Sequence, residues 1–171
     1  MISKKIQDAI NAQINAELYS SYLYLSMSAW FSAQNLAGFA SWMKMQVQEE
    51  NFHTMKMYDY VIERGGQTIL KAIDGPPIEW DSPLAVFEAT YAHERKVTGL
   101  VNELVNLAIE EKDHAANIFL QWFVNEQVEE EASADEIVQK LKLLADAPGG
   151  LYMLDQEMGQ RVFTPPATEG N

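Results

Sequence analysis

Residues 39–60 read FASWMKMQVQEENFHTMKMYDY, and this stretch decides the fold class. Apolar side chains recur in it every three or four positions, which is the period of an α-helix with one buried face. Two residues on that face, Glu50 and His53, are polar and lie one helical turn apart. The same period recurs over residues 6–31, 84–108 and 120–144. The sequence therefore predicts four helices of roughly 27 to 32 residues, each ~40–48 Å long.

Breaks in the helical pattern lie between these segments, near residues 35–38, 65–66, 74–83, 112–114 and 148–150, and three of the five contain prolines or paired glycines. Short connections make helices one and two antiparallel, and likewise three and four. The roughly 17 residues between Gly65 and Pro83 are too many for a turn and suit a crossover along the bundle. We predict an all-α four-helix bundle with this long crossover between helices two and three and a short fifth C-terminal helix, LYMLDQEMGQR. Residues 1–162 are expected to form one domain and residues 163–171 a flexible tail.

The chain of 171 residues has no cysteine, and its 12 basic and 25 acidic residues give a net charge of −13. This charge argues against nucleic acid and anionic membranes as partners. The lack of cysteine excludes disulfides and thiolate metal sites. We find neither a long apolar run nor a signal peptide, so the expected compartment is the cytoplasm.

Six polar residues lie on the apolar faces of the predicted helices, where they would be buried. Buried carboxylates are costly unless a cation compensates them, and no Lys or Arg shares their helical phase nearby. Carboxylate oxygens with one imidazole suit Fe(II) or Mn(II), and a di-iron bundle uses single glutamates together with Glu-x-x-His pairs. The fourth helix departs from that pattern, with Gln127-x-x-Glu130 and no second histidine. A Glu-x-x-His pair alone is weak evidence for a metal site. Because the rotation of each helix is uncertain by about one residue, Glu49 and Glu126 could point inward instead. The six residues are Glu17, Glu50, His53, Glu94, Gln127 and Glu130.

Five runs along the chain are similar to those of the non-haem ferritins of bacteria and archaea, and the resemblance covers nearly the whole length. It implies a ferroxidase that oxidises Fe(II) with dioxygen or peroxide and stores the product as a hydrated ferric oxide in a shell of 24 subunits. Haem-binding relatives carry methionine where Asn51 follows the bridging glutamate, so we expect no haem. The runs are INAELYSSYLYLSMSAWF, QEENFH, ERGG, HERKV and FLQWFVNEQVEEE.

The resemblance also implies roles for individual residues. Glu17, Glu50 and His53 match a first iron site, with Glu50 bridging to a second site that includes Glu94 and Glu130. Gln127 matches an amide beside that second site. Tyr24 matches a tyrosine that supplies an electron, although it also fits a core tyrosine bonded to a ligand carboxylate.

The resemblance further implies a third iron site, built from Glu49, Glu126, Glu129 and Glu130. The spacing of Glu126, Glu129 and Glu130 places them on one helical face, where like charges repel unless a cation lies among them. The alternative is a solvated acidic face. His93 and His114 are expected to be structural or exposed.

Two observations bear on assembly and on rival functions. Apolar side chains extend beyond the core stripe of helix one, which favours a homo-oligomer. The rival is a di-iron or di-manganese bundle that detoxifies peroxide without storage, and a fifth helix would have no role in such a free bundle. DNA-protecting relatives are a further rival, but the N-terminus carries only Lys4 and Lys5. The apolar residues are Leu18, Tyr19, Tyr22, Leu23, Leu25 and Trp30.

Overall fold

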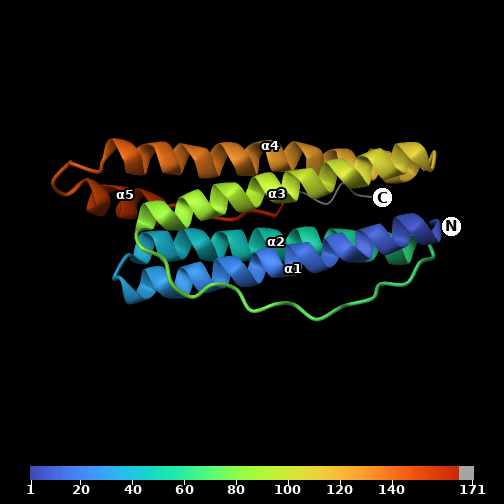
Figure 1. Cartoon of the computed structure of the whole chain (residues 1–171), viewed down its shortest axis with the longest axis horizontal. Coiled ribbons are helices and arrows are strands. Elements are labelled where there is room, and N and C mark those ends of the chain that lie inside the picture. Colours follow the sequence, from blue (N-terminus) through green and yellow to red (C-terminus); the bar gives the residue numbers. More distant parts are fainter. Residues whose placement is uncertain (166–171) are drawn as a thin grey trace.

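The computed structural model describes residues 1–165, and its five helices confirm the predicted fold class (Figure 1). Each long helix starts at or close to a capping or turn signal in the sequence. Ser3 and Ser82 cap helices one and three through their hydroxyls, and Asp113 caps helix four by accepting a hydrogen bond from the Ala116 amide. The helices are α1 (Lys4–Ala33), α2 (Ala37–Glu63), α3 (Pro83–Glu110), α4 (His114–Leu143) and α5 (Gly150–Met158).

The crossover between α2 and α3 runs along the outside of the bundle from one end to the other, as predicted (Figure 1). Side chains of α1 hold it there. Asn11 donates to the Gln67 carbonyl and accepts from the Ile69 amide, both at 3.0 Å. Further along, Ser26 donates to the Pro77 carbonyl at 2.6 Å. The crossover returns the chain to the end of the bundle where α3 begins.

The bundle core consists of two apolar clusters with a polar section between them. One cluster surrounds Phe31, Phe39 and Phe87 near the α5 end. The other surrounds Ile10 and Leu120 near the opposite end. Apolar packing on both sides therefore fixes the four helices, whatever contacts the polar side chains between the clusters make with one another.

The fifth helix differs from its prediction in length and in role. It ends at Met158, three residues before the end of the predicted segment at Arg161. It also packs on α2, because the carboxylate of Asp155 accepts hydrogen bonds from the Gly38 and Phe39 amides at 2.9 and 3.0 Å. The expectation that it has no role in a single bundle is therefore wrong, since Asp155 satisfies amides at the start of α2 that have no partner within the helix.

The predicted tail divides into two parts. Phe163 packs against Phe52, with ring centroids 6.3 Å apart, so the predicted tail begins with an ordered contact. Residues 166–171 lie outside the described residues.

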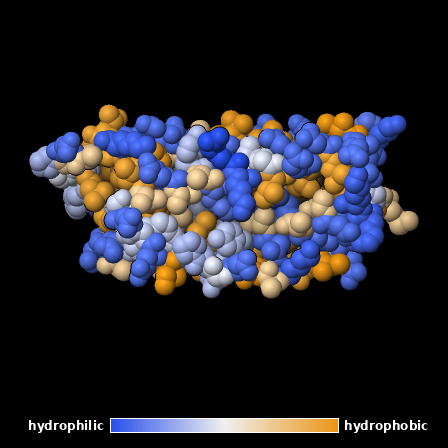
Figure 2. Space-filling view, viewed as in Figure 1, coloured by the Kyte–Doolittle hydropathy of each residue, from blue (hydrophilic) through white to orange (hydrophobic). Residues whose placement is uncertain are grey.

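Apolar side chains remain on the surface, where they are interspersed with hydrophilic ones (Figure 2). Of the six α1 residues predicted to be exposed in a monomer, Tyr22 and Leu25 are about half exposed, whereas Leu23 is buried. Ile69, Leu70 and Ile78 on the crossover add further exposed apolar area. Among residues 1–165, no helix combines the length and apolarity that crossing a bilayer requires.

Candidate metal centre

All six polar residues predicted on the core faces are at most 5 % exposed. Glu17 comes from α1, Glu50 and His53 from α2, Glu94 from α3, and Gln127 and Glu130 from α4. They lie in the polar section between the two apolar clusters, because each interrupts the apolar stripe of its helix at a similar height. His93 and His114 lie apart from this group. His93 shares a hydrogen bond of 2.8 Å with Ser20, and His114 is the first residue of α4.

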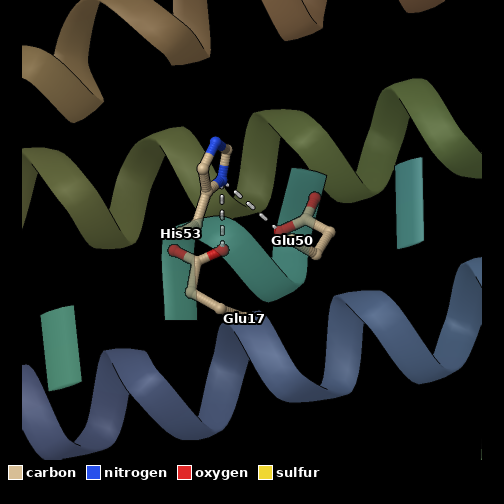
Figure 3. A group of neighbouring side chains, drawn as sticks. All are labelled: Glu17, Glu50 and His53. Carbon is tan, nitrogen blue, oxygen red and sulfur yellow. Dashed lines mark ion pairs between the residues drawn. The ribbon is translucent and has the colours of Figure 1, made fainter. Parts of the chain in front are cut away.

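Glu17, Glu50 and His53 converge on one point (Figure 3). His53 Nδ1 lies 4.0 Å from Glu17 Oε2 and 3.7 Å from Glu50 Oε2, and one ligand atom from each residue lies within 4.8 Å of the others. These separations are too long for hydrogen bonds but suit ligands around one metal ion, at roughly 2 Å from each. Carboxylate oxygens with a single imidazole favour Fe(II) or Mn(II) over thiolate-binding metals.

Several buried polar atoms in the centre have no hydrogen-bond partner among the described residues. Glu17 Oε2, Glu50 Oε2, Glu94 Oε2 and His53 Nε2 are all in this state. An unpaired buried polar atom costs free energy that proteins rarely tolerate, and one cation can compensate several carboxylate oxygens together. The unpaired carboxylate oxygens of Glu17, Glu50 and Glu94 therefore mark where a positive ion would bind.

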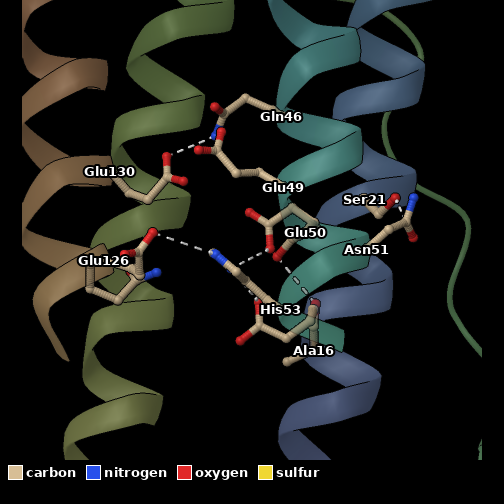
Figure 4. Close-up of polar contacts among 12 residues, drawn as sticks. Ala16, Ser21, Gln46, Glu49, Glu50, Asn51, His53, Glu126 and Glu130 are labelled. Atoms are coloured by element: carbon tan, nitrogen blue, oxygen red, sulfur yellow. Dashed lines mark hydrogen bonds and ion pairs between the residues drawn. The ribbon is translucent and has the colours of Figure 1, made fainter. Parts of the chain in front are cut away.

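Neighbouring side chains fix the other oxygens. The Gln13 amide donates to Glu17 Oε1 at 2.8 Å. The Gln46 amide donates to Glu130 Oε2, also at 2.8 Å (Figure 4). The Tyr24 hydroxyl donates to Glu94 Oε1. Such contacts orient ligands so that one oxygen of each remains directed at the metal. Gln13 was missed in the sequence, although its position four residues before Glu17 places it on the same face.

Burial and mutual repulsion shift the pKa values of these groups. Burial raises the pKa of Glu50 well above its usual value, and the charges of Glu17 and Glu94 raise it further. The pKa of Glu130 is also raised, by burial first and then by the Glu94 charge. Burial lowers the pKa of His53, which keeps its imidazole neutral and able to bind a metal. Metal binding should therefore release protons from the glutamates.

Glu94 should make the stability of the metal-free protein depend on pH. Burial raises its pKa from 4.5 to about 7, against hydrogen bonds from Tyr24 and Gln127 that lower it. Between these two values the folded chain keeps a proton that the unfolded chain has lost, so the free energy of unfolding falls as pH rises. We expect a loss on the order of 3 kcal/mol between pH 5 and pH 8.

Thermal melts of metal-free wild type and Glu94→Gln at both pH values measure this effect. The wild type should melt at a lower temperature at pH 8, and the variant should show a smaller difference, while Glu50 and Glu130 with their own raised pKa values keep the remainder. Equal wild-type midpoints at the two pH values would contradict the raised pKa.

Beside the centre, Glu49, Glu126 and Glu130 of the predicted third site lie between α2 and α4 (Figure 4), whereas Glu129 is exposed. His53 Nε2 lies 4.0 Å from Glu126 Oε2, so the two groups of ligands adjoin. Burial raises the pKa of both Glu49 and Glu126; the charge of Glu129 raises both further, while Arg161 lowers that of Glu49. Glu49 has a basic partner that the sequence did not reveal, because Arg161 pairs with it at 2.5 Å.

Taken together, the fold and these residues define a class of protein, the four-helix bundle with a buried carboxylate and histidine metal centre. Comparison with known proteins identifies the family. The model of the ferritin-like domain matches residues 7–144. The chain belongs to the ferritin family.

The most similar relatives and structures agree with this assignment. A bacterial non-heme ferritin of Bacteroides fragilis is 52 % identical over 94 % of this chain and 100 % of its own length. A probable bacterial non-heme ferritin-like protein of Haemophilus influenzae is 41 % identical over 93 % of this chain and 96 % of its own. An engineered closed form of the Archaeoglobus fulgidus ferritin is 55 % identical, with a TM-score of 0.94 over 96 % of this chain and all of that one.

Proposed function

We propose that this chain oxidises Fe(II) at the buried centre and stores the Fe(III) as a hydrated oxide inside a shell of 24 copies. The observation that carries the proposal is the set of buried carboxylate oxygens without hydrogen-bond partners in the described part of the chain, on three glutamates from three helices. Family membership supports iron as the metal, and the chemistry of the donor set suits it. Residues 1–162 would form the single domain that assembles.

In this proposal two Fe(II) ions are the substrate. Glu17 and His53 bind one, Glu94 and Glu130 bind the other, and Glu50 bridges the two. Gln127 lies beside the second ion, and its oxygen accepts a hydrogen bond of 3.1 Å from Thr98. Anionic oxygen ligands stabilise Fe(III) more than Fe(II), so the centre favours electron loss. Each ion gives one electron, and dioxygen or peroxide accepts both.

A third cation is proposed among Glu49, Glu126, Glu129 and Glu130. Its support is the mutual repulsion of these carboxylates, because burial and then the charges of Glu129 and Glu49 raise the pKa of Glu126, and the position of Glu126 Oε2 4.0 Å from His53 Nε2, which places the cluster beside the main centre. Glu130 would connect the third position to the main pair. The third ion would lie on the route that Fe(III) takes out of the centre.

Assembly is supported by the apolar surface on α1 and the crossover. Exposed Tyr22, Leu25 and Leu70 would be covered by a second copy. The net charge of −13 per chain would also attract Fe(II) to the acidic shell.

Size-exclusion chromatography with light scattering, before and after Fe(II) loading in air, tests this function. We expect a particle of about 463 kDa, which is 24 times 19.3 kDa, that retains far more iron than its binding sites can hold. A small oligomer that keeps only two or three ions per chain would instead favour the rival enzyme that detoxifies peroxide.

Tyr24 gives a second test, specific to the chemistry. Its hydroxyl is buried and donates to Glu94, and burial raises its pKa well above the usual value, so it stays a phenol. We expect Tyr24→Phe to bind Fe(II) with nearly unchanged affinity but to oxidise it about tenfold more slowly, which equals roughly 1.4 kcal/mol on the barrier.

Stopped-flow absorbance at several Fe(II) ratios measures this rate. Tyr22→Phe, on the exposed side of the same helix, is the matched control and should behave as wild type. If the Tyr24→Phe traces overlay the wild type at every ratio, Tyr24 serves only in packing.

A further inference from the structure

The segment after α5 turns back and lies along α2 (Figure 1). The Arg161 guanidinium lies over the Trp42 ring, 4.4 Å from its centroid, and Phe163 packs against Phe52. Trp42 and Phe52 are ten residues apart on α2, a rise of about 15 Å. The segment therefore follows α2 past the centre instead of leaving the bundle at the end of α5.

Arg161 places a positive charge against the glutamates of the proposed third site, which we call the acidic cluster (Glu49, Glu126, Glu129 and Glu130). Its Nη2 atom donates to Glu49 Oε2 at 2.5 Å, and the two side chains are only 25 % and 20 % exposed. Its charge also acts on Glu130, since it lowers the pKa of that carboxyl against the effect of burial. The second guanidinium nitrogen, Nη1, is buried and has no hydrogen-bond partner within residues 1–165.

The other cation near the cluster has a different position. Lys56 lies over the Trp122 ring, 4.6 Å from its centroid, and its charge acts on Glu126. No ion pair joins Lys56 to a carboxylate of the cluster among the described residues. Arg161 is thus the basic residue that directly pairs with a predicted ligand of the third ion.

We propose that Arg161 is the resident counter-ion of this cluster, and that a third metal ion binds there only by displacing the guanidinium from Glu49. The proposal rests on the third site of the proposed function. Glu49 Oε2 cannot accept the short Arg161 hydrogen bond and coordinate a metal ion in the same direction. An arginine stays protonated at all physiological pH values, so metal competes with Arg161 directly and not through a proton.

Two consequences follow from this competition. With no third ion bound, the guanidinium offsets the repulsion among the glutamates and keeps the cluster closed. When an ion binds, its affinity is reduced by the free energy of the Arg161 pair, so the ion is held weakly and leaves easily. Because the stack on Trp42 belongs to the same side chain, displacement should also change the surroundings of that indole.

Isothermal titration of the metal-free assembled protein with Zn(II) tests the proposal without oxidation. Zn(II) accepts carboxylate and imidazole ligands and has no redox chemistry. We expect Arg161→Gln to tighten the weakest binding event by about twofold to fivefold, the range for one partly exposed ion pair. The tighter events of the main centre should be unchanged, and Arg161→Lys should lie between the two proteins.

Lys140→Gln is the matched control. Lys140 pairs with Glu157 of α5 at 2.7 Å, so this change removes one positive charge from the same region without touching the cluster. It should titrate as wild type. Tryptophan fluorescence provides an independent readout, since the weakest Zn(II) event should change the emission of wild type but not that of Trp42→Phe or Arg161→Gln.

The outcomes separate this proposal from the third site itself. Suppose that Glu126→Ala abolishes the weak event, but Arg161→Gln and wild type bind with the same affinity. The third site would then stand, and the role of Arg161 would be overturned. Weaker binding in Arg161→Gln would also overturn it. No weak event in either protein would overturn both, whereas an event seen only in Arg161→Gln would support displacement. Anomalous diffraction from Fe(II)-soaked crystals should show Arg161 moved from Glu49 wherever the third position is filled.

Discussion

Glu50→Ala and His53→Ala should each abolish fast Fe(II) oxidation while the shell still assembles. Both side chains are at most 2 % exposed; Glu50 Oε2 is buried without a hydrogen-bond partner among residues 1–165, and His53 Nδ1 lies 3.7 Å from it. Glu50 is proposed to bind both ions, so its loss should lower the initial rate by a hundredfold or more, about 2.7 kcal/mol on the barrier. The metal-free Glu50→Ala bundle should be no less stable than wild type, since a repelling carboxylate has gone.

Stopped-flow oxidation and chromatography of the same samples measure both parts of this expectation. Glu103→Ala, on the exposed side of α3, is the matched control and should keep the wild-type rate. Oxidation at the wild-type rate in Glu50→Ala would refute the bridging role. If His53→Ala fails to assemble, His53→Gln tests the same role, because it keeps a polar side chain of similar length.

The long helices could be predicted because residues close to their ends in the sequence determine where they begin. Ser82 with Pro83, and Asp113 just before α4, are start signals that act within a few residues. The end of α5 was misplaced although LYMLDQEMGQR contains its stop signal, because Gly159 caps the helix directly after Met158. The chain leaves the helix where Arg161 gains its contacts with Trp42 and Glu49, and those partners are distant in sequence.

The centre was predictable for the same reason, since a carboxylate in an apolar stripe is visible without knowing the fold. What could not be predicted is the set of contacts between helices. Gln46 lies on the core stripe of α2, but only the packing of α4 shows that it holds Glu130. Exposure of α1 was misjudged at Leu23, because burial depends on what the crossover and the neighbouring helices cover.

The second large effect is expected where α5 meets α2. A Cβ atom on Gly38 would lie 1.6 Å from the carbonyl oxygen of Asp155, which belongs to the backbone and cannot rotate away. Glycine is therefore required here by close approach. Asp155 is itself buried and caps α2 through the Gly38 and Phe39 amides, so displacing α5 also removes these two hydrogen bonds.

Gly38→Ala should consequently destabilise the protein by about 3 kcal/mol or more, since it combines a backbone clash with the loss of a buried cap. Gly99→Ala is the matched control, because Gly99 lies in α3 with nothing within 4 Å of the added carbon, and alanine there should stabilise by about 0.5–1 kcal/mol. Thermal melts followed by circular dichroism, at one scan rate for all proteins, measure both changes. Hydrogen exchange should also show α5 and the segment of Arg161 losing protection in Gly38→Ala alone. If Gly38→Ala has the melting temperature of wild type and keeps that protection, the close packing of α5 on α2 is wrong.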